Sequence, residues 1–258
     1  MNSLEAAFDN LPPFPPVASQ VITLTSSELV SFQEVADVLK SDAALTAEVL
    51  RLANSPLVAP TRYAVSSVLP ALNLIGLKRL VGLVMTLSLS KFLKRAGTSP
   101  LIRRSWRHNL ACGLAARETA EAFREEPDEA YNAGLFHDLG RIAFLVMDAH
   151  RYESLVATEG DIRELERDRF GIDHCQAGAL ILANWRLPKV FADVARYHHE
   201  PTPDCGLSGI VNSSCAVANR LGFSVRPPDP LVQPLEHEVE LGAEICRIID
   251  TLEVEYGV

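Results

Sequence analysis

The segment AGLFHDLGR, residues 133–141, joins a His–Asp pair to small and apolar neighbours. Asp138 directly follows His137, and the flanking residues are of the kind that pack inside a helical bundle. Imidazole nitrogen and carboxylate oxygen suit divalent ions such as Fe, Mn, Co or Zn. Such an ion can hold a phosphate oxygen and lower the pKa of a bound water. The segment therefore predicts a helical fold that carries a metal or phosphate site.

The rest of the chain also predicts helices, because apolar residues recur at helical spacing and Gly and Pro fall between them. Ser31 with Glu34, and Asp173 with Gln176, have the spacing of a capping box, which predicts that a helix begins after Ser31 and another after Asp173. The other expected helices cover residues 16–25, 43–53, 65–75, 77–93, 102–122, 127–148, 150–159, 188–199, 207–221 and 235–253.

The fold class is therefore predicted to be all-α, a two-lobed helical bundle. The stretch AGTSP, residues 96–100, is small, polar and punctuated by proline, so we place the internal boundary there. The lobes are residues 1–99 and 100–258, and we expect them to pack as one unit.

Composition is typical of a globular protein, with 48% hydrophobic and 22% charged residues. Residues 1–10 lack the basic and apolar pattern of a secretory signal, and the longest apolar run is too short to span a membrane. The five cysteines are scattered without a Cys-x-x-Cys pair, which favours reduced thiols. We expect a cytoplasmic protein that does not bind membranes.

Charge is unevenly distributed along the chain. Residues 49–117 contain eleven Lys or Arg and no Asp or Glu, whereas the whole chain carries −9. This basic segment either docks an anion or an acidic partner, or pairs with acidic faces of the same fold or of a second copy in a homodimer. An acidic protein is a poor general binder of nucleic acid, so we do not expect that partner. The candidate anion or partner surface comprises Lys78, Arg79, Lys91, Lys94, Arg95, Arg103, Arg104 and Arg107.

Five of the seven histidines stand at positions where a bundle could bring them together: His108, His137, His174, His198 and His199. The alternative is that each is an ordinary core or surface residue, and the last two would also complement a helix dipole. The chain lacks a Gly-x-Ser-x-Gly elbow, a phosphate-binding loop and a dinucleotide glycine fingerprint.

Three N-terminal motifs are similar to those of the HDOD domain family, a relative of the HD metal-dependent phosphohydrolases of bacterial signalling. They are LPPFP at residues 11–15, SDAALTAEVLRLANS at 41–55, and the stretch from VSSV at 65–68 to LIG at 74–76. The resemblance spans about residues 10–249, and residues from 100 onward resemble the HD-type lobe. It implies an N-terminal HDOD lobe packed on an HD-like lobe.

The resemblance assigns metal-binding roles to His108, His137, Asp138, His174, His198 and His199. It also implies that the site can be vestigial, with the residues kept but the metal lost. Three positions depart from the catalytic relatives. Cys215 stands at the closing Asp, residues 201–206 lack the Gly-Tyr-Pro of enzymes that cleave cyclic di-GMP, and Arg141 replaces a usual Lys. Loss of the closing carboxylate removes an anionic ligand. A thiolate could substitute for it, with a preference for softer metals.

We therefore expect a bacterial signal-transduction module that regulates other signalling proteins by contact, without turnover and with no required cofactor. No receiver, cyclase or kinase segment is found in the 258 residues, so its input and output are expected from other molecules. Two alternatives stay open. One is a metal-dependent phosphohydrolase acting on a nucleotide or another phosphoester. The other is a sensor that binds a nucleotide, with the basic segment supplying anion contacts.

Overall fold

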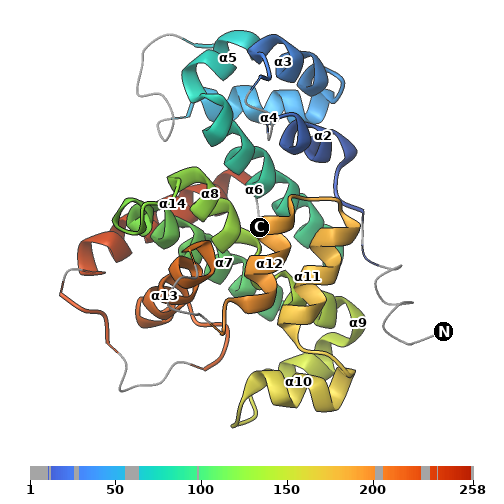
Figure 1. Ribbon diagram of the computed structural model, residues 1–258, viewed down its shortest axis with the longest axis vertical. Helices are drawn as coiled ribbons and strands as arrows, with labels where there is room; N and C mark the ends of the chain where they lie inside the picture. Colours follow the sequence, from blue (N-terminus) through green and yellow to red (C-terminus); the bar gives the residue numbers. More distant parts are fainter. Residues whose placement is uncertain are drawn as a thin grey trace. The chain divides into compact units, whose positions relative to one another are not determined.

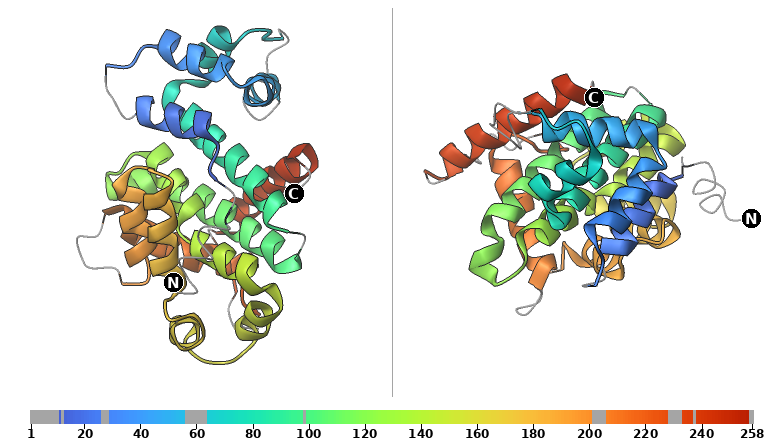
Figure 2. Two further views of the ribbon diagram at one scale, coloured as in Figure 1. Left: turned by 90° about the vertical axis from the view of Figure 1, so that its right-hand side faces the viewer. Right: turned by 90° about the horizontal axis from the view of Figure 1, so that it is seen from above.

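A computed structural model describes residue 11 and residues 13–25, 29–55, 64–97, 99–200, 206–227, 233–236 and 238–256. Every regular element in these ranges is a helix, and no strand occurs among them (Figures 1 and 2). The all-α prediction is confirmed.

Contacts divide the chain into two compact units. Of the described residues, those in 14–91 form one unit, and those from 92 onward form the other. The predicted boundary near residue 99, and the packing of two lobes into one unit, stay predictions.

The first unit is built from short helices with well-defined ends. Ser31 caps one of them: its Oγ accepts from the Glu34 amide at 3.2 Å, and Glu34 Oε2 accepts from the Ser31 amide at 2.8 Å. The predicted capping box is thus confirmed, and α3 packs on α2, α4 and α5. The helices are α2 (Pro16–Thr25), α3 (Phe32–Lys40), α4 (Ala43–Ala53), α5 (Val68–Ile75) and the first part of α6 (Leu77–Ala96).

The second unit is organised around α7, which packs against α8, α9, α13 and α14. Trp106 and Leu110 of α7 are fully buried. A second packed group joins α11 to α9 and α12. The helices are α7 (Pro100–Thr119), the 3-10 helix η1 (Ala120–Phe123), α8 (Pro127–Phe136), α9 (Leu139–Val156), α10 (Ile162–Phe170), α11 (His174–Asn184), α12 (Lys189–Tyr197), α13 (Gly206–Arg220) and α14 (Glu238–Tyr256).

The prediction of one helix over residues 127–148 is wrong, because the chain leaves helical geometry at Asp138 (φ −102°, ψ 18°). Two glycines explain the break. A Cβ on Gly134 would lie 2.7 Å from the Cα of Gly113, so α8 packs closely on α7. A Cβ on Gly140 would lie 2.0 Å from the His174 carbonyl oxygen, so α9 packs closely on α11. The consecutive helices are thus held by different neighbours, and His137 and Asp138 lie at the bend between them.

Among the described residues, no single helix has the length and apolarity needed to cross a membrane. Among these residues, only α5 and α6 taken together have that length and apolarity, and this pair of helices is bent by 108°.

Candidate metal centre

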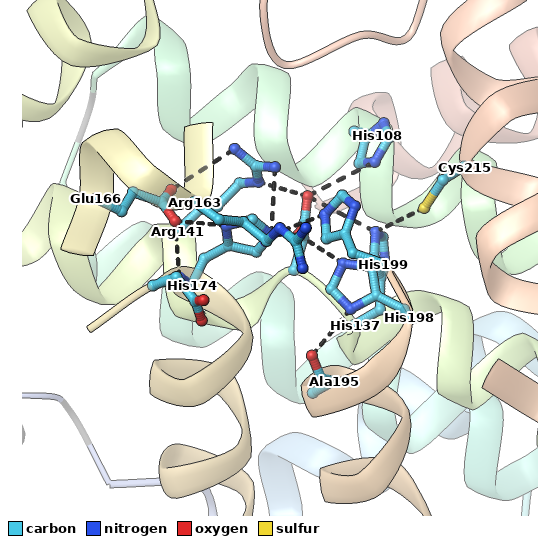
Figure 3. Close-up of polar contacts among 12 residues, drawn as sticks. His108, His137, Arg141, Arg163, Glu166, His174, Ala195, His198, His199 and Cys215 are labelled. Carbon is cyan, nitrogen blue, oxygen red and sulfur yellow. Dashed lines mark hydrogen bonds and ion pairs between the residues drawn. The ribbon is translucent and has the colours of Figure 1, made fainter. Parts of the chain in front are cut away.

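Four parts of the second unit bring the predicted histidines together (Figure 3). His108 lies on α7, His137 and Asp138 lie at the bend between α8 and α9, and His174 is the first residue of α11. His198 and His199 directly follow α12. Asp173 caps α11 through a capping box with Gln176, which confirms that prediction and fixes the start of the helix at His174.

Each of four imidazoles is held at its Nδ1 atom. His137 Nδ1 donates to the Gly134 carbonyl at 2.7 Å, His198 Nδ1 to the Ala195 carbonyl at 2.9 Å and His108 Nδ1 to the Phe223 carbonyl at 3.0 Å. His174 Nδ1 lies 2.6 Å from Glu166 Oε2. A carbonyl only accepts, so in the neutral form His137, His198 and His108 carry the ring proton on Nδ1 and leave a lone pair on Nε2. This arrangement is the one that orients histidine for a metal.

The Asp138 carboxylate lies among these Nε2 atoms. Its Oδ2 is 3.6 Å from His137 Nε2 and 3.7 Å from His108 Nε2. Its Oδ1 is 3.3 Å from His174 Nε2 and 3.5 Å from His198 Nε2. Asp138 is only 2% exposed, yet its Oδ1 and the Nε2 of His198 have no hydrogen-bond partner within the described part of the chain.

A buried ion-pair network supports the carboxylate from one side. Arg141 Nε donates to Asp138 Oδ2 at 2.6 Å, and its Nη1 lies 3.9 Å from Glu166 Oε1. Glu166, fully buried on α10, also accepts from the Tyr152 hydroxyl at 2.6 Å and from the His174 amide at 2.8 Å. One guanidinium thus serves two carboxylates, so the network carries one uncompensated negative charge when the histidines are neutral.

The electrostatic environment sets the protonation states of Asp138 and His137 at this centre. Burial by itself would raise the pKa of Asp138, but Arg141 and the surrounding histidines hold the pKa well below its usual range. Burial lowers the pKa of His137 well below its ordinary value of 6.5. At neutral pH the carboxylate is therefore ionised, and the His137 imidazole is neutral and can accept a metal.

Cys215 completes the cluster from α13. Its Sγ lies 3.0 Å from His137 Nε2 and 3.5 Å from Cys112 Sγ. The hydrogen bond with Cys112 and burial both raise the pKa of Cys215 well above its ordinary value, so this cysteine is a thiol unless a cation displaces its proton.

These residues fit a divalent transition metal. Three sets of donors have all their ligand atoms within 4.8 Å of one another, namely His108–His137–Cys215, His137–Asp138–His198 and His174–Cys175–His198–His199. The unsatisfied Asp138 Oδ1 and His198 Nε2 are the buried atoms that an ion would satisfy. Imidazole, carboxylate and thiol donors suit Fe, Mn, Co or Zn.

Comparison with known proteins identifies the family. A family model for the HDOD domain matches residues 11–201. The chain belongs to the HDOD family. A protein of Treponema pallidum (strain Nichols), named "Uncharacterized protein", is 21% identical over 203 residues, which are 76% of this chain and 39% of that protein. The HDOD chain therefore spans well under half the length of this relative.

Three solved structures have the same fold as this HDOD protein. A "Putative phosphohydrolase" from Shewanella amazonensis SB2B has a TM-score of 0.72 at 20% identity, with 99% of this chain and 88% of that chain covered. An HDOD domain protein with unknown function from Geobacter sulfurreducens has a TM-score of 0.69 at 24% identity, with 98% of this chain and 95% of that chain covered. A "Putative signal transduction protein" from Marinobacter aquaeolei VT8 has a TM-score of 0.74 at 21% identity, with 99% of this chain and 64% of that chain covered. At these identities the likeness shows the fold.

All six predicted metal residues of the HDOD chain lie in the cluster. Five of them are buried, and His199 is the exposed member, with its Nε2 3.1 Å from His174 Nε2. Their role as ligands stays a prediction.

The predicted basic surface lies on α6 and α7, and its α7 members already have partners. Arg107 pairs with Glu253 at 2.7 Å and Arg103 pairs with the same carboxylate at 2.9 Å, both across to α14. Arg104 donates to the Val225 carbonyl at 3.3 Å. These contacts match the alternative in which the basic segment pairs with acidic faces of the same fold. The remaining members, on α6, are Lys78, Arg79, Lys91, Lys94 and Arg95.

Sequence reasoning did not find four contributors to the site: Cys112, Tyr152, Glu166 and the ion-pairing role of Arg141. Glu166 lies on α10, a helix that was not predicted. Asp161 caps this helix and Gly171 ends it, so its termini carried a detectable signal. No pattern marked Glu166 as buried and its neighbour Glu164 as exposed.

A pocket of about 170 Å³ opens onto the cluster. Its lining includes His108, His137, His198, Cys215 and Asn219. Ligand sites for small molecules usually measure about 300–1,000 Å³. The pocket therefore has room for an ion with bound waters or for a phosphate group, but it cannot enclose a whole nucleotide.

Proposed function

We propose that this chain is an HDOD-type regulator of signal transduction that holds a divalent transition-metal ion in its HD-like lobe and acts on other cytoplasmic signalling proteins by contact, without turnover. The observation that carries the metal is the pair of buried, unsatisfied atoms, Asp138 Oδ1 and His198 Nε2, beside His137, whose Nδ1 donates to a backbone carbonyl as that of His198 does. The membership of the HDOD family, and the name of the Marinobacter aquaeolei structure, support the signalling role.

Chemistry at the cluster supports binding more than turnover. A bound divalent ion would supply Lewis acidity and a site for a phosphate oxygen. The residues around it restrict that use. Arg141 already occupies Asp138 Oδ2, and Cys215 provides a neutral thiol where an enzyme of this type would have a further carboxylate. The small pocket also argues against a sensor that encloses a nucleotide.

The metal is tested by elemental analysis of the full chain after expression with Fe, Mn, Co or Zn. About one ion per chain is expected. Asp138→Asn and His198→Gln should each abolish retention, because each removes one of the two unsatisfied donors. His150→Gln, which changes an exposed histidine of α9, is the matched control and should retain the ion. Wild-type chain that stays free of metal in all four media would refute the proposal.

A phosphohydrolase is the second candidate, and the pocket favours it. The space beside Asp138 and His137 would admit a phosphate group, with the rest of a phosphoester outside. The name of the Shewanella amazonensis structure agrees with this chemistry. The metal-loaded chain should then release phosphate from at least one member of a phosphoester panel, and His137→Gln should abolish that release. Release that is unchanged in His137→Gln would point to a contaminant.

A further inference from the structure

Two cysteines from different helices bring their sulfur atoms into contact. Cys112 Sγ of α7 lies 3.5 Å from Cys215 Sγ of α13, and it also lies 3.7 Å from the carbonyl oxygen of Val211, one turn earlier in α13. The two helices pack closely at this place, and both cysteines are free thiols. Because the sulfur atoms are already in contact, a small rotation of the two side chains would bring them to bonding distance.

The two cysteines differ in their access to solvent. Cys112 is fully buried, whereas Cys215 is half-buried and lines the pocket that opens onto the histidines. In this pocket Cys215 Sγ lies 3.0 Å from His137 Nε2 (Figure 3). A small molecule that enters the pocket therefore meets the sulfur of Cys215 first, and Cys112 lies next to that sulfur as a second thiol.

We propose that Cys112 and Cys215 are an oxidation-sensitive pair, and that a hydroperoxide entering the pocket converts them into an intramolecular disulfide between α7 and α13. The inference goes beyond the proposed metal and signalling functions and depends on neither. A disulfide that forms under oxidation and is reduced again is typical of redox sensing and not of a structural framework.

The reaction balances with one hydroperoxide for two thiols. The Cys215 sulfur attacks the outer oxygen, the O–O bond breaks, and the thiol proton leaves with the other oxygen as an alcohol, or as water when the oxidant is hydrogen peroxide. Cys215 is then a sulfenic acid. The Cys112 sulfur attacks the Cys215 sulfur, the S–O bond breaks, and the hydroxyl group leaves with the Cys112 proton as water. Two electrons thus pass from the two sulfurs to the hydroperoxide.

The surroundings of Cys215 make the first step slow. The thiolate is the reactive form, and the hydrogen bond with Cys112 together with burial raises the pKa of Cys215 well above its ordinary value. The pair therefore responds to sustained exposure and not to a brief pulse of peroxide. Once formed, the disulfide joins residues 103 positions apart in the chain and holds Cys215 Sγ towards Cys112 and away from His137. Oxidation thereby changes the wall of the pocket beside the histidines.

Peptide mapping after peroxide treatment tests the pair without any measurement of turnover. The full chain is freed of reductant, held in excess hydrogen peroxide for hours with a chelator present, and its remaining thiols are then blocked. Mass spectrometry of a proteolytic digest should find the Cys112 and Cys215 peptides cross-linked, and dithiothreitol should release them. The same treatment in concentrated urea should lose the preference for this pair, because only the fold places the two sulfurs in contact.

Single substitutions separate the roles of the two thiols. Cys112→Ala should give no cross-link and should leave Cys215 as a sulfenic acid that dimedone traps. Cys215→Ala should leave Cys112 reduced, because Cys112 is fully buried. Cys246→Ala, on α14, is the matched control and should keep the cross-link. Circular dichroism checks that each variant is folded, and the mapping of the wild-type chain decides the question even where a variant is not.

Three results would overturn the proposal. In the first, Cys112 and Cys215 of the folded wild-type chain both stay reduced after the full treatment. In the second, Cys215 forms a disulfide with a cysteine other than Cys112. In the third, Cys215 is oxidised to a sulfinic acid while Cys112 stays a thiol, which would mean that Cys112 cannot reach the sulfenic acid.

Discussion

Replacing Gly140 by alanine tests how the His–Asp segment builds the site. The added Cβ would lie 2.0 Å from the His174 carbonyl oxygen and 2.7 Å from the Gly178 amide nitrogen. Both are backbone atoms, so no flexible side chain can move aside, and α9 and α11 must separate by more than about 1 Å to restore ordinary contact.

Overpacking of this kind costs about 1–3 kcal/mol, and a clash with backbone belongs at the upper end. Alanine recovers roughly 0.5–1 kcal/mol through its better helix propensity. The net loss in free energy of unfolding should be about 2 kcal/mol. Metal affinity should fall as well, because the displaced carbonyl belongs to His174 itself.

Urea denaturation of the metal-free chain measures the stability, and cobalt titration measures the affinity. Gly178→Ala is the matched control, since it lies on the same interface but its Cβ would be 3.3 Å from its nearest neighbour. Its free energy of unfolding should stay within about 1 kcal/mol of wild type, because the contact is tight but tolerable. If Gly140→Ala is as stable as Gly178→Ala, α9 and α11 are not held as closely as described.

Three further perturbations have expected outcomes. Glu166→Ala removes a buried acceptor of Tyr152 and His174 and leaves Arg141 with a single carboxylate. Urea denaturation should therefore show a loss of about 3–5 kcal/mol in the free energy of unfolding. A loss under about 1 kcal/mol would mean that the network does not hold α10. Burial lowers the pKa of His137 below 6.5, so the unfolded chain binds this proton more readily. The melting temperature of the metal-free chain should therefore fall as the pH drops below 6.5, with a smaller slope in His137→Gln; equal slopes would exclude His137 as the cause. Glu253→Gln breaks the ion pairs with Arg107 and with Arg103, whose side chain is 61% exposed. The free energy of unfolding should therefore fall by about 1 kcal/mol or less in low salt and by almost nothing in high salt. A loss that salt leaves unchanged would contradict an electrostatic origin.

Helices with a strong apolar pattern or a complete cap could be predicted from the sequence. The capping boxes at Ser31 and Asp173 form as their spacing indicated, and α2 and α4 have the expected bounds. Prediction failed where tertiary contacts override local pattern. Residues 133–141 are good helix formers, yet the close approaches at Gly134 and Gly140 fix two separate helices. The helix α10 was missed because it buries only Ile162 and Glu166, too few to give an apolar period.

The order of the histidines along the chain indicated which of them could come together. It did not indicate which charged and thiol groups would contact them. Glu166 reaches His174 from a helix of its own, and Cys112 reaches Cys215 across the α7–α13 contact. Such pairs depend on the relative positions of two packed helices, which sequence spacing along one helix does not encode. The residues that balance the site electrostatically were therefore found only in three dimensions.

Arg141 decides how the cluster can be used. A carboxylate between two groups of imidazoles could in principle bridge two ions, one at each oxygen. Here the guanidinium nitrogen, 2.6 Å from Oδ2, supplies a permanent positive charge where a second ion would add two more. Because like charges at such separations repel strongly inside a protein, one ion is the more stable occupancy. A single ion held by buried ligands stabilises the folded state in proportion to its occupancy, since it binds only the native chain. Under the proposed metal-binding function, we therefore expect a bound ion to stabilise this unit of the fold, and we expect no two-metal hydrolysis.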